Sequence, residues 1–300
     1  AMAPLVTADV EPIDVDAKPI GQFDRTSSER RLFGRLEFRG GLDLSSSSAR
    51  FGGFSGIEVA PDGRHFVAVS DETGWLTGEI VYDGRKPKGI ANSRMGAMLG
   101  VAGKVLDRKR DHDAEAVALG EGTLADGTLL IGFERNHRIG RFPIRAGVVG
   151  APTGYLKLPP GARRMAANKG FEAVTVLQGG PHKGATIAFS ERYLDADRNH
   201  TGWLWLQGEP QRLGLRDIGE FDITDAKSLV DGALVVLERR FRWLEGVKMR
   251  LRLIKAADVR PGALLDGEVL LEADMGYDID NMEGLAVHRG PAGETVLTLI

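Results

Sequence analysis

The stretch SGIEVAPDGRHFVAVSD, residues 55–71, decides the fold because its pattern returns four more times along the chain. Each copy has an acidic residue near its head, a short apolar run, a turn rich in Gly, Asp or Pro, and a second apolar run. The other copies occupy residues 113–135, 170–192, 224–240 and 281–300. The leading acids follow one another at intervals of 57, 57, 53 and 58 residues: Glu58, Glu115, Glu172, Asp225 and Glu283. Self-similarity at this period, built from strand-like segments, predicts a propeller or a solenoid rather than separate domains.

Four strand-like runs fit between one leading acid and the next. After Glu172, for example, these runs are residues 173–177, 185–191, 202–207 and 212–221. Each run is rich in apolar, β-branched or aromatic residues and is bounded by turn residues. One period therefore predicts one four-stranded blade. Five periods predict an all-β β-propeller of five blades, with six blades as the alternative.

The two ends of the chain are expected to complete the ring. The last repeat stops at Ile300 after two strands, so we expect the C-terminal end of the last blade to be missing from this sequence. The segment RLFGRLEFRGGLDL, residues 31–44, is predicted to supply an outer strand there and to close the ring. With 42% apolar residues and no linker, residues 1–300 are predicted to form a single domain, of which residues 1–30 are partly irregular.

A second acid ends the second apolar run in four of the repeats. These trailing acids are Asp71, Glu134, Glu191 and Glu238. Three of them are followed directly by an arginine: Arg135, Arg192 and Arg239. A hairpin brings the start of its first strand beside the end of its second, and the first strand of a propeller blade lines the central channel. The sequence therefore predicts that the leading acids ring one mouth of the channel, with the trailing acids just outside them.

Composition excludes several classes of protein. The net charge is -3 and the basic residues are dispersed, so the electrostatics of a nucleic-acid binder are missing. No apolar stretch approaches the roughly 20 residues that cross a bilayer, so no membrane insertion is expected. The chain has no cysteine, which excludes disulfides and thiolate metal sites. We expect a monomer that binds a small phosphate ester or another anionic molecule.

Five blocks of sequence carry a resemblance to a known family. They are FGGFSGIEVAPDG, DAEAVAL with GFERNHRI, NKGFEAVTVL with FSERY, DITDAKSL with LERRF, and DNMEGLAV. From about Phe51 to Ile300 the chain resembles the bacterial phytase-like domain family, which is described as having esterase-like activity of phytase. The resemblance implies a β-propeller, hydrolysis of phosphate esters and export to the periplasm or beyond, although no signal peptide is visible in this chain. Family members usually continue past the final TLI, so we expect a longer natural polypeptide.

A ring of carboxylates needs a cation, or else its members raise one another's pKa. Calcium suits such a ring because it takes 6 to 8 oxygen ligands in irregular geometry. A bound calcium can polarise a phosphoryl oxygen and activate a water, and arginine can bind phosphate oxygens through two parallel hydrogen bonds. We predict catalytic roles for Glu115, Glu172, Glu283, Arg135, Arg192 and Arg239. We predict that calcium is bound by Glu58, Asp71, Glu134, Glu191, Asp225, Glu238 and Asp280. Three further residues are expected near this blade end: Lys169, Lys227 and His137.

The same residues also have a structural interpretation. Repeated acids and arginines can pair neighbouring blades, and buried pairs of that kind persist as structural networks. Three functions therefore stay open: a calcium-dependent phosphoester hydrolase, a lactonase-like metal-dependent hydrolase of other esters, and a non-enzymatic binding or scaffold propeller. Metal dependence and affinity for phosphate would distinguish them, whereas analogy between folds does not.

Two weaker motifs are assigned to turns. Residues 195–201 have the alternating oxygen side chains of a calcium loop, but His200 stands where such a loop needs glycine. Ser55 lies among glycines whose spacing does not match a nucleophile elbow. We predict that neither is a functional site.

Overall fold

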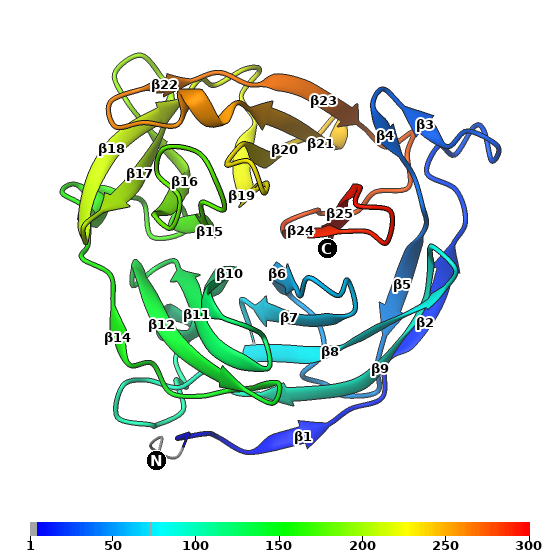
Figure 1. Ribbon diagram of the computed structural model, residues 1–300, viewed down its shortest axis with the longest axis horizontal. Helices are drawn as coiled ribbons and strands as arrows, with labels where there is room; N and C mark the ends of the chain where they lie inside the picture. The colour runs from blue at the N-terminus through cyan, green and yellow to red at the C-terminus, as the bar shows by residue number, and fades with distance from the viewer. Residues whose placement is uncertain (1–4, 73) are drawn as a thin grey trace.

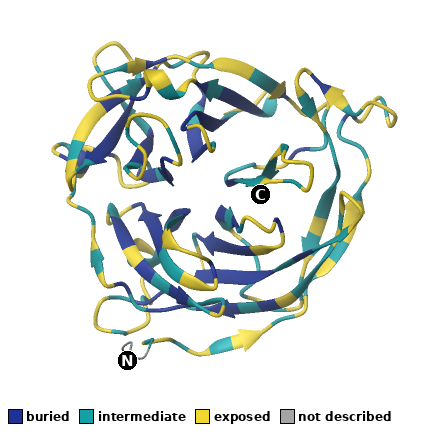
Figure 2. Ribbon diagram, viewed as in Figure 1, coloured by how far each residue is buried: buried dark blue, intermediate teal, exposed yellow. Residues whose placement is uncertain are grey.

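A computed structural model of the chain describes residues 5–72 and 74–300 and has the β-propeller architecture that the repeats predict (Figure 1). Four full sheets surround a central channel, each built from strands that follow one another in the chain and pair antiparallel. Figure 2 shows that buried residues concentrate in these sheets, whereas the connecting turns are largely exposed.

The full blades have four consecutive strands or their equivalent, which run in chain order from the channel outward. The first blade consists of β6 (Phe54–Val59), β7 (His65–Ser70), β8 (Gly74–Asp83) and β9 (Lys86–Gly96), with β1 (Val10–Pro12) on its outer edge. The second consists of β10 (Ala114–Gly122), β11 (Asp126–Phe133) and β12 (Arg138–Arg145), on which the two-residue strands β13 (Val148–Val149) and β14 (Gly154–Tyr155) pair. The third consists of β15 (Phe171–Val176), β16 (Thr186–Leu194), β17 (His200–Leu206) and β18 (Glu209–Leu215), with β22 (Leu264–Leu265) parallel to β18. The fourth consists of β19 (Asp222–Ser228), β20 (Leu234–Arg242), β21 (Gly246–Ile254) and β23 (Glu268–Ala273).

Helix is scarce and short in the described chain. One turn of α-helix, α1 (Lys109–His112), precedes β10, and the 3-10 turns η1 (Ala162–Arg164) and η2 (Ala256–Asp258) lie in connections. No helix among the described residues is long and apolar enough to cross a membrane.

The fifth position of the ring holds only the hairpin β24 (Leu285–Arg289) and β25 (Thr295–Leu299). β24 packs beside β19 on one side and beside β6 on the other, so the inner strands of five repeats surround the channel. Four blades are therefore complete, and a two-stranded hairpin occupies the fifth position, in agreement with the predicted period.

The prediction that residues 31–44 form a strand that closes the ring is wrong. Residues 31–44 do not form one strand; they form the small hairpin of β3 (Leu32–Phe33) and β4 (Leu36–Glu37) and then lead into β5 (Gly41–Ser45). Gly34 and Gly40 have φ of 62° and 138°, and these turn conformations interrupt any continuous strand. β5 pairs with β2 (Asp16–Ile20), not with β25, and Figure 1 shows this pair at the rim, outside β24 and β25. The ring is thus not closed by hydrogen bonds.

Hydrophobic contact between neighbouring blades holds the ring together instead. Buried apolar side chains form five clusters, and each cluster draws on two neighbouring blades. Representative pairs, in order around the ring, are Val67 with Phe133, Ala116 with Phe171, Phe189 with Val236, Leu237 with Leu285, and Ala286 with Ile57. Because the partial blade contributes to the last two clusters, burial closes the ring where hydrogen bonds do not.

A buried ion network fixes the fourth blade. The Glu238 carboxylate accepts hydrogen bonds from Arg250 Nε at 2.7 Å and from an Arg252 terminal nitrogen at 2.6 Å, and all three residues are buried. The two arginines also donate to the backbone carbonyls of Ile218 and Arg216. The network therefore ties β20 and β21 to the chain that leaves the third blade.

Removing the Glu238 carboxylate should destabilise the protein strongly. Glu238→Ala leaves two guanidinium groups buried without their anion, and we expect the free energy of unfolding to fall by about 3–5 kcal/mol. Urea unfolding followed by circular dichroism measures this. The control is Glu268→Ala, which removes an exposed partner of Arg35 and should cost less than about 1 kcal/mol. Equal losses for the two variants would contradict a special role for the buried network.

Candidate mouth of the central channel

A β-bulge at the start of each inner strand decides which side chain reaches the channel mouth. In the first four blades the pairing with the second strand skips one residue, and in the fifth both Glu283 and Gly284 donate to the Ile300 carbonyl. The skipped residues are Ser55, Glu115, Glu172 and Thr224, with Glu283 at the equivalent place in the fifth blade. Bulges re-aim side chains at the rims of sheets, and here they define the inner ring of the mouth.

This register corrects two members of the predicted ring. Glu115, Glu172 and Glu283 occupy equivalent positions as predicted, but Glu58 lies three residues further along its strand and Asp225 one residue further. The polar residues Ser55 and Thr224 take the places that the prediction gave to Glu58 and Asp225. The inner ring therefore has three carboxyls, and blades one and four interrupt it with hydroxyls.

Glu58 and Asp225 belong to a charged group inside the channel, centred on Lys227. The Lys227 ammonium lies 3.5 Å from Asp225 Oδ2 and 3.8 Å from Glu58 Oε2, and it donates to the backbone carbonyls of Val117 at 2.6 Å and Val174 at 3.4 Å. These partners come from three other inner strands and its own. Lys227 therefore spans the channel below the mouth, instead of lying at the blade end where it was predicted.

Burial dominates the electrostatics of this channel group. Burial raises the pKa of Asp225 to about 7, although Lys227 and the backbone N–H groups of Leu285 and Ala226 oppose the shift. Burial likewise raises the pKa of Glu58, against the opposing charge of Lys227. With one cation and two acids, Lys227, Glu58 and Asp225 together carry a net charge of -1 (one minus two) when all three are ionised. Protonation of one of the two acids makes the group neutral.

The outer ring also differs by one residue from the predicted ring. Asp71, Glu134 and Glu191 each directly follow the last residue that pairs with the start of the inner strand (Ser70, Phe133 and Ser190). In the fourth blade, Arg239 takes the equivalent place. Glu238 pairs with Ile223, which makes it equivalent to the buried Ser70, Phe133 and Ser190. Glu238 therefore points away from the mouth into its ion network and does not lie with the other predicted metal ligands.

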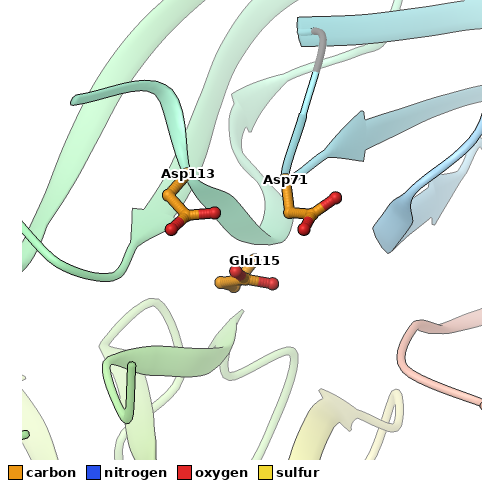
Figure 3. Close-up of side chains that lie close together, drawn as sticks. All are labelled: Asp71, Asp113 and Glu115. Atoms are coloured by element: carbon orange, nitrogen blue, oxygen red, sulfur yellow. The ribbon is translucent and has the colours of Figure 1, made fainter. Parts of the chain in front are cut away.

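Three carboxylates between the first and second blades have the spacing of a metal site. Asp71, Asp113 and Glu115 each offer an oxygen, and these oxygens lie within 4.8 Å of one another (Figure 3). Asp113, which precedes β10, was missed by sequence reasoning; its signal was the Asp-Ala-Glu spacing that turns both acids of a bulged strand toward the same place. We call Asp71, Asp113 and Glu115 the acidic triad.

Two cations contact the acidic triad. Lys109, on α1, lies 2.9 Å from Asp71 Oδ2 and 2.9 Å from Asp113 Oδ1, and it also donates to the Asp71 carbonyl at 3.1 Å. Arg135 Nε donates to the other oxygen of Asp113. Glu115 receives no such contact; its carboxyl is hydrogen-bonded to the Ser55 hydroxyl. Ser55 therefore supports the mouth as a buried hydroxyl and not as a turn residue alone.

Three carboxyl groups at the mouth, including Glu115 of the triad, have no cation of the described chain at ion-pair distance. Among the residues that the structure describes, Glu115, Glu134 and Glu172 form no ion pair within 4 Å. Burial raises the pKa of Glu115 to about 9, with further contributions from Glu134 and Asp113. Burial, Asp113 and Glu191 raise the pKa of Glu134 to about 7, against the charge of Arg135. Burial raises the pKa of Glu172 well above its ordinary value, and the neighbouring carboxylates of Glu115, Glu191, Glu134 and Glu283 add to the shift.

The cations on the other side of the mouth link neighbouring blades. Arg192 of the third blade donates to Asp222 of the fourth at 2.7 Å. Arg239 of the fourth blade donates to Glu283 of the fifth at 2.7 Å. These contacts match the structural interpretation of the repeated arginines.

Arg239 and a further cation, Lys169, converge on the carboxylate of Glu191. Lys169 lies 2.6 Å from Glu191 Oε2, and Arg239 lies 3.7 Å from Glu191 Oε1. Lys169 reaches Asp222 as well, at 3.5 Å. Burial raises the pKa of Glu191, and Lys169 opposes that shift most strongly. Glu191 thus stands between an acidic arc and a cationic arc of the mouth.

Other predicted residues lie at the edges. Asp280 is exposed and accepts the backbone N–H of Asn281, while Asn281 itself contacts Arg239 at 2.5 Å and Glu283 at 2.6 Å. His137 is packed against the 161–170 connection, with Nε2 3.4 Å from the Met165 carbonyl, and burial lowers its pKa. Residues 195–199 form the predicted turn, which the Asp195 side chain closes, whereas His200 and Thr201 already belong to β17.

Comparison with known proteins supplies the family. The sequence profile described as "Phytase-like: Esterase-like activity of phytase" matches residues 49–300. The chain belongs to this family. Phytase-like identity and the propeller arrangement thus agree with the resemblance read from the repeated blocks.

Comparisons with curated proteins and with solved structures give no further assignment. No curated protein matches the chain. Among solved structures, the WD40 repeats of RRP9 align over 81% of this chain and 67% of that one, with a TM-score of 0.36 and 10% identity. An oxidoreductase from Thermus thermophilus, described as a glucose dehydrogenase, aligns over 87% of this chain and 84% of that one, with a TM-score of 0.32 and 15% identity. TM-scores this low carry no argument about the phytase-like protein.

The raised pKa values predict how stability varies with pH. A carboxyl whose pKa rises on folding stabilises the folded state below its unfolded pKa, and that contribution is lost as the pH rises through the folded pKa. For Glu115 this range runs from 4.5 to about 9, and for Glu134 from 4.5 to about 7. We therefore expect the free energy of unfolding of the metal-free protein to fall continuously across this range, as measured by urea unfolding in the presence of a chelator.

The neutral variant Glu115→Gln is the control for this pH dependence. It keeps the shape of the side chain and removes the group that titrates highest, so the fall above about pH 7 should be smaller. Stability that stays level or rises over this range in the parent protein would contradict the raised pKa values.

Proposed function

We propose that this phytase-like protein is a calcium-dependent hydrolase of phosphate esters that acts at the acidic mouth of its channel. One observation carries the proposal: Glu115, which forms no ion pair with any described residue, belongs to a triad of carboxylates with metal-ligand spacing, and two more carboxyl groups without such ion pairs, Glu134 and Glu172, lie close to it. Like charges this close need protonation or a cation, and a bound metal ion would supply the cation.

The acidic triad fits calcium by its donor chemistry. Asp71, Asp113 and Glu115 offer only carboxylate oxygens, which are the ligands that calcium prefers, and Asp113 and Glu115 are buried. Lys109 contacts two of the three carboxylates, but its side chain is 44% exposed and belongs to a single helical turn. Binding of an ion would require this ammonium to move aside and Glu115 to lose its proton.

The protein's own groups would perform the remaining chemistry. When bound, calcium would polarise a phosphoryl oxygen and lower the pKa of a coordinated water. Glu134, with a pKa of about 7, is suited to accept or donate a proton near neutral pH. Lys169 and Arg239, which meet at Glu191, would attract the negative charge of the substrate to the opposite side of the mouth.

Glu115→Gln tests the proposal directly. We expect calcium affinity, measured by calorimetry on metal-stripped protein, to fall more than about tenfold, together with turnover of p-nitrophenyl phosphate. The matched control is Glu121→Gln, which changes an exposed glutamate at the far end of the same strand, β10, and should leave both unchanged. Parent protein that binds no calcium would overturn the proposal.

A second function is favoured by one observation, the pairing of the mouth arginines between blades. If Arg192 and Arg239 serve only these pairs, the mouth is architecture and the propeller is a non-enzymatic binding or scaffold protein. The same assays separate the alternatives. Calcium binding with turnover of lactones or carboxylic esters but not phosphate esters would indicate the lactonase-like function, and neither binding nor turnover would indicate the scaffold. The periplasmic location and the monomeric state stay predictions.

A further inference from the structure

The hairpin between β20 and β21 ends in an apolar apex that the fold does not use. Trp243 is 88% exposed and Leu244 is 95% exposed, and Phe241 and Met275 beside them are 64% and 47% exposed. The turn is ordered by a hydrogen bond from the Glu245 N–H to the Arg242 carbonyl at 3.0 Å and by Gly246 at a φ of 72°. Trp243 and Leu244 therefore hold the two central positions of a tight turn.

Other hairpin turns of the same chain show what the fold alone requires. In five of them the two residues at the tip are Pro61 and Asp62, Gly84 and Arg85, Ala146 and Gly147, Gln207 and Gly208, and Val230 and Asp231, so none of these tips carries an aromatic residue or two large apolar side chains. Gly, Pro and Asp favour such positions through their backbone preferences, whereas Trp and Leu offer a turn nothing. A tryptophan in solvent also gains no packing. The fold and the turn therefore do not account for Trp243 and Leu244 at this place.

The stem of this hairpin is held by charge. Glu245 lies 2.7 Å from Arg240, 3.2 Å from Arg242 and 3.1 Å from Lys248, and Arg242 also pairs with Glu220 at 2.8 Å. These contacts fix the hairpin and surround the apex with three cationic side chains. An apolar tip is thus presented on a rigid stem, whose three cations and two acids, Glu245 and Glu220, leave a net charge of +1 (three minus two) around it.

We propose that this apex docks the protein on a lipid surface by inserting Trp243 and Leu244 into the interfacial region of a membrane. Tryptophan prefers the membrane–water interface, and arginine and lysine beside it keep their charges among the headgroups. A protein partner would need about 800 Å² on this side, far more than the side chains of a single turn supply. A convex tip of this size suits a deformable lipid surface.

Docking would also orient the molecule. Arg239 of the channel mouth lies on β20 only four residues before Trp243, so the apex rises from the same end of the ring as the mouth. Attachment through Trp243 would therefore place the mouth on the side that faces the lipid. Such docking does not depend on the proposed hydrolase activity, and it concerns attachment at a surface, since no described helix crosses a bilayer.

Tryptophan fluorescence can report this contact selectively. The chain has four tryptophans, and Trp75, Trp203 and Trp205 are at most 5% exposed, so a change of environment on binding belongs to Trp243. Vesicles of phosphatidylcholine with phosphatidylglycerol should shift the emission to shorter wavelength and bring the protein down on sedimentation. Trp243→Ser combined with Leu244→Ser should weaken vesicle binding by about tenfold or more.

The matched control is Val230→Ser, which removes an exposed apolar side chain (57% exposed) from the turn at the opposite end of the same blade. It should bind vesicles like the parent protein. Three results would overturn the proposal: no vesicle binding by the parent protein, equal binding by the apex variant, or a Trp243 blue shift without lipid that rises with protein concentration, which would show that a second copy covers the apex. Unchanged circular dichroism and unfolding of the apex variant would confirm that the loss is not misfolding.

Discussion

The geometry of the mouth depends on one constraint, the residue that each inner strand leaves unpaired at its start. A bulge turns the skipped side chain toward the channel and shifts every residue after it by one position relative to the second strand. Without the bulge, Glu115 and Glu172 would follow the ordinary alternation of the strand and the mouth would hold different side chains. The same shift explains why Ala116 and Ala173 pack between blades directly after two acids.

Two charge arrangements follow from that geometry, and they differ in kind. Inside the channel, Lys227 lies between Glu58 and Asp225, so both of these acids have a cationic partner within the protein. At the mouth, Glu115, Glu134 and Glu172 face one another, while Lys169, Arg192 and Arg239 are engaged on the other side. The burial of uncompensated acids is costly, and the proposed metal ion would supply the missing positive charge.

The sequence predicted the blades better than it predicted the ring of side chains. A repeat of apolar runs and turns is enough to place four strands in each period, because burial and turn chemistry act locally. The predicted ring of acids, however, required every repeat to carry its acid at the same position relative to the strand pairing. The first repeat carries Ser55 and the fourth carries Thr224 where the other three carry glutamate, so Glu58 was displaced by three residues and Asp225 by one. The fourth repeat also carries Arg239 where the first three carry an acid, so Glu238 was displaced by one residue. Asp113 and Lys109 were missed because their roles arise from contacts between blades, which no local pattern contains.

Lys227 has a consequence for how any ligand reaches the mouth. Its buried ammonium contacts groups on the inner strands of the first, second and third blades from the fourth, so this side chain reaches across the axis of the ring. The channel is therefore occupied by a side chain below its mouth. A ligand that binds at the mouth would therefore enter and leave on the same face of the ring, and a departing product and an arriving substrate would compete for that one route.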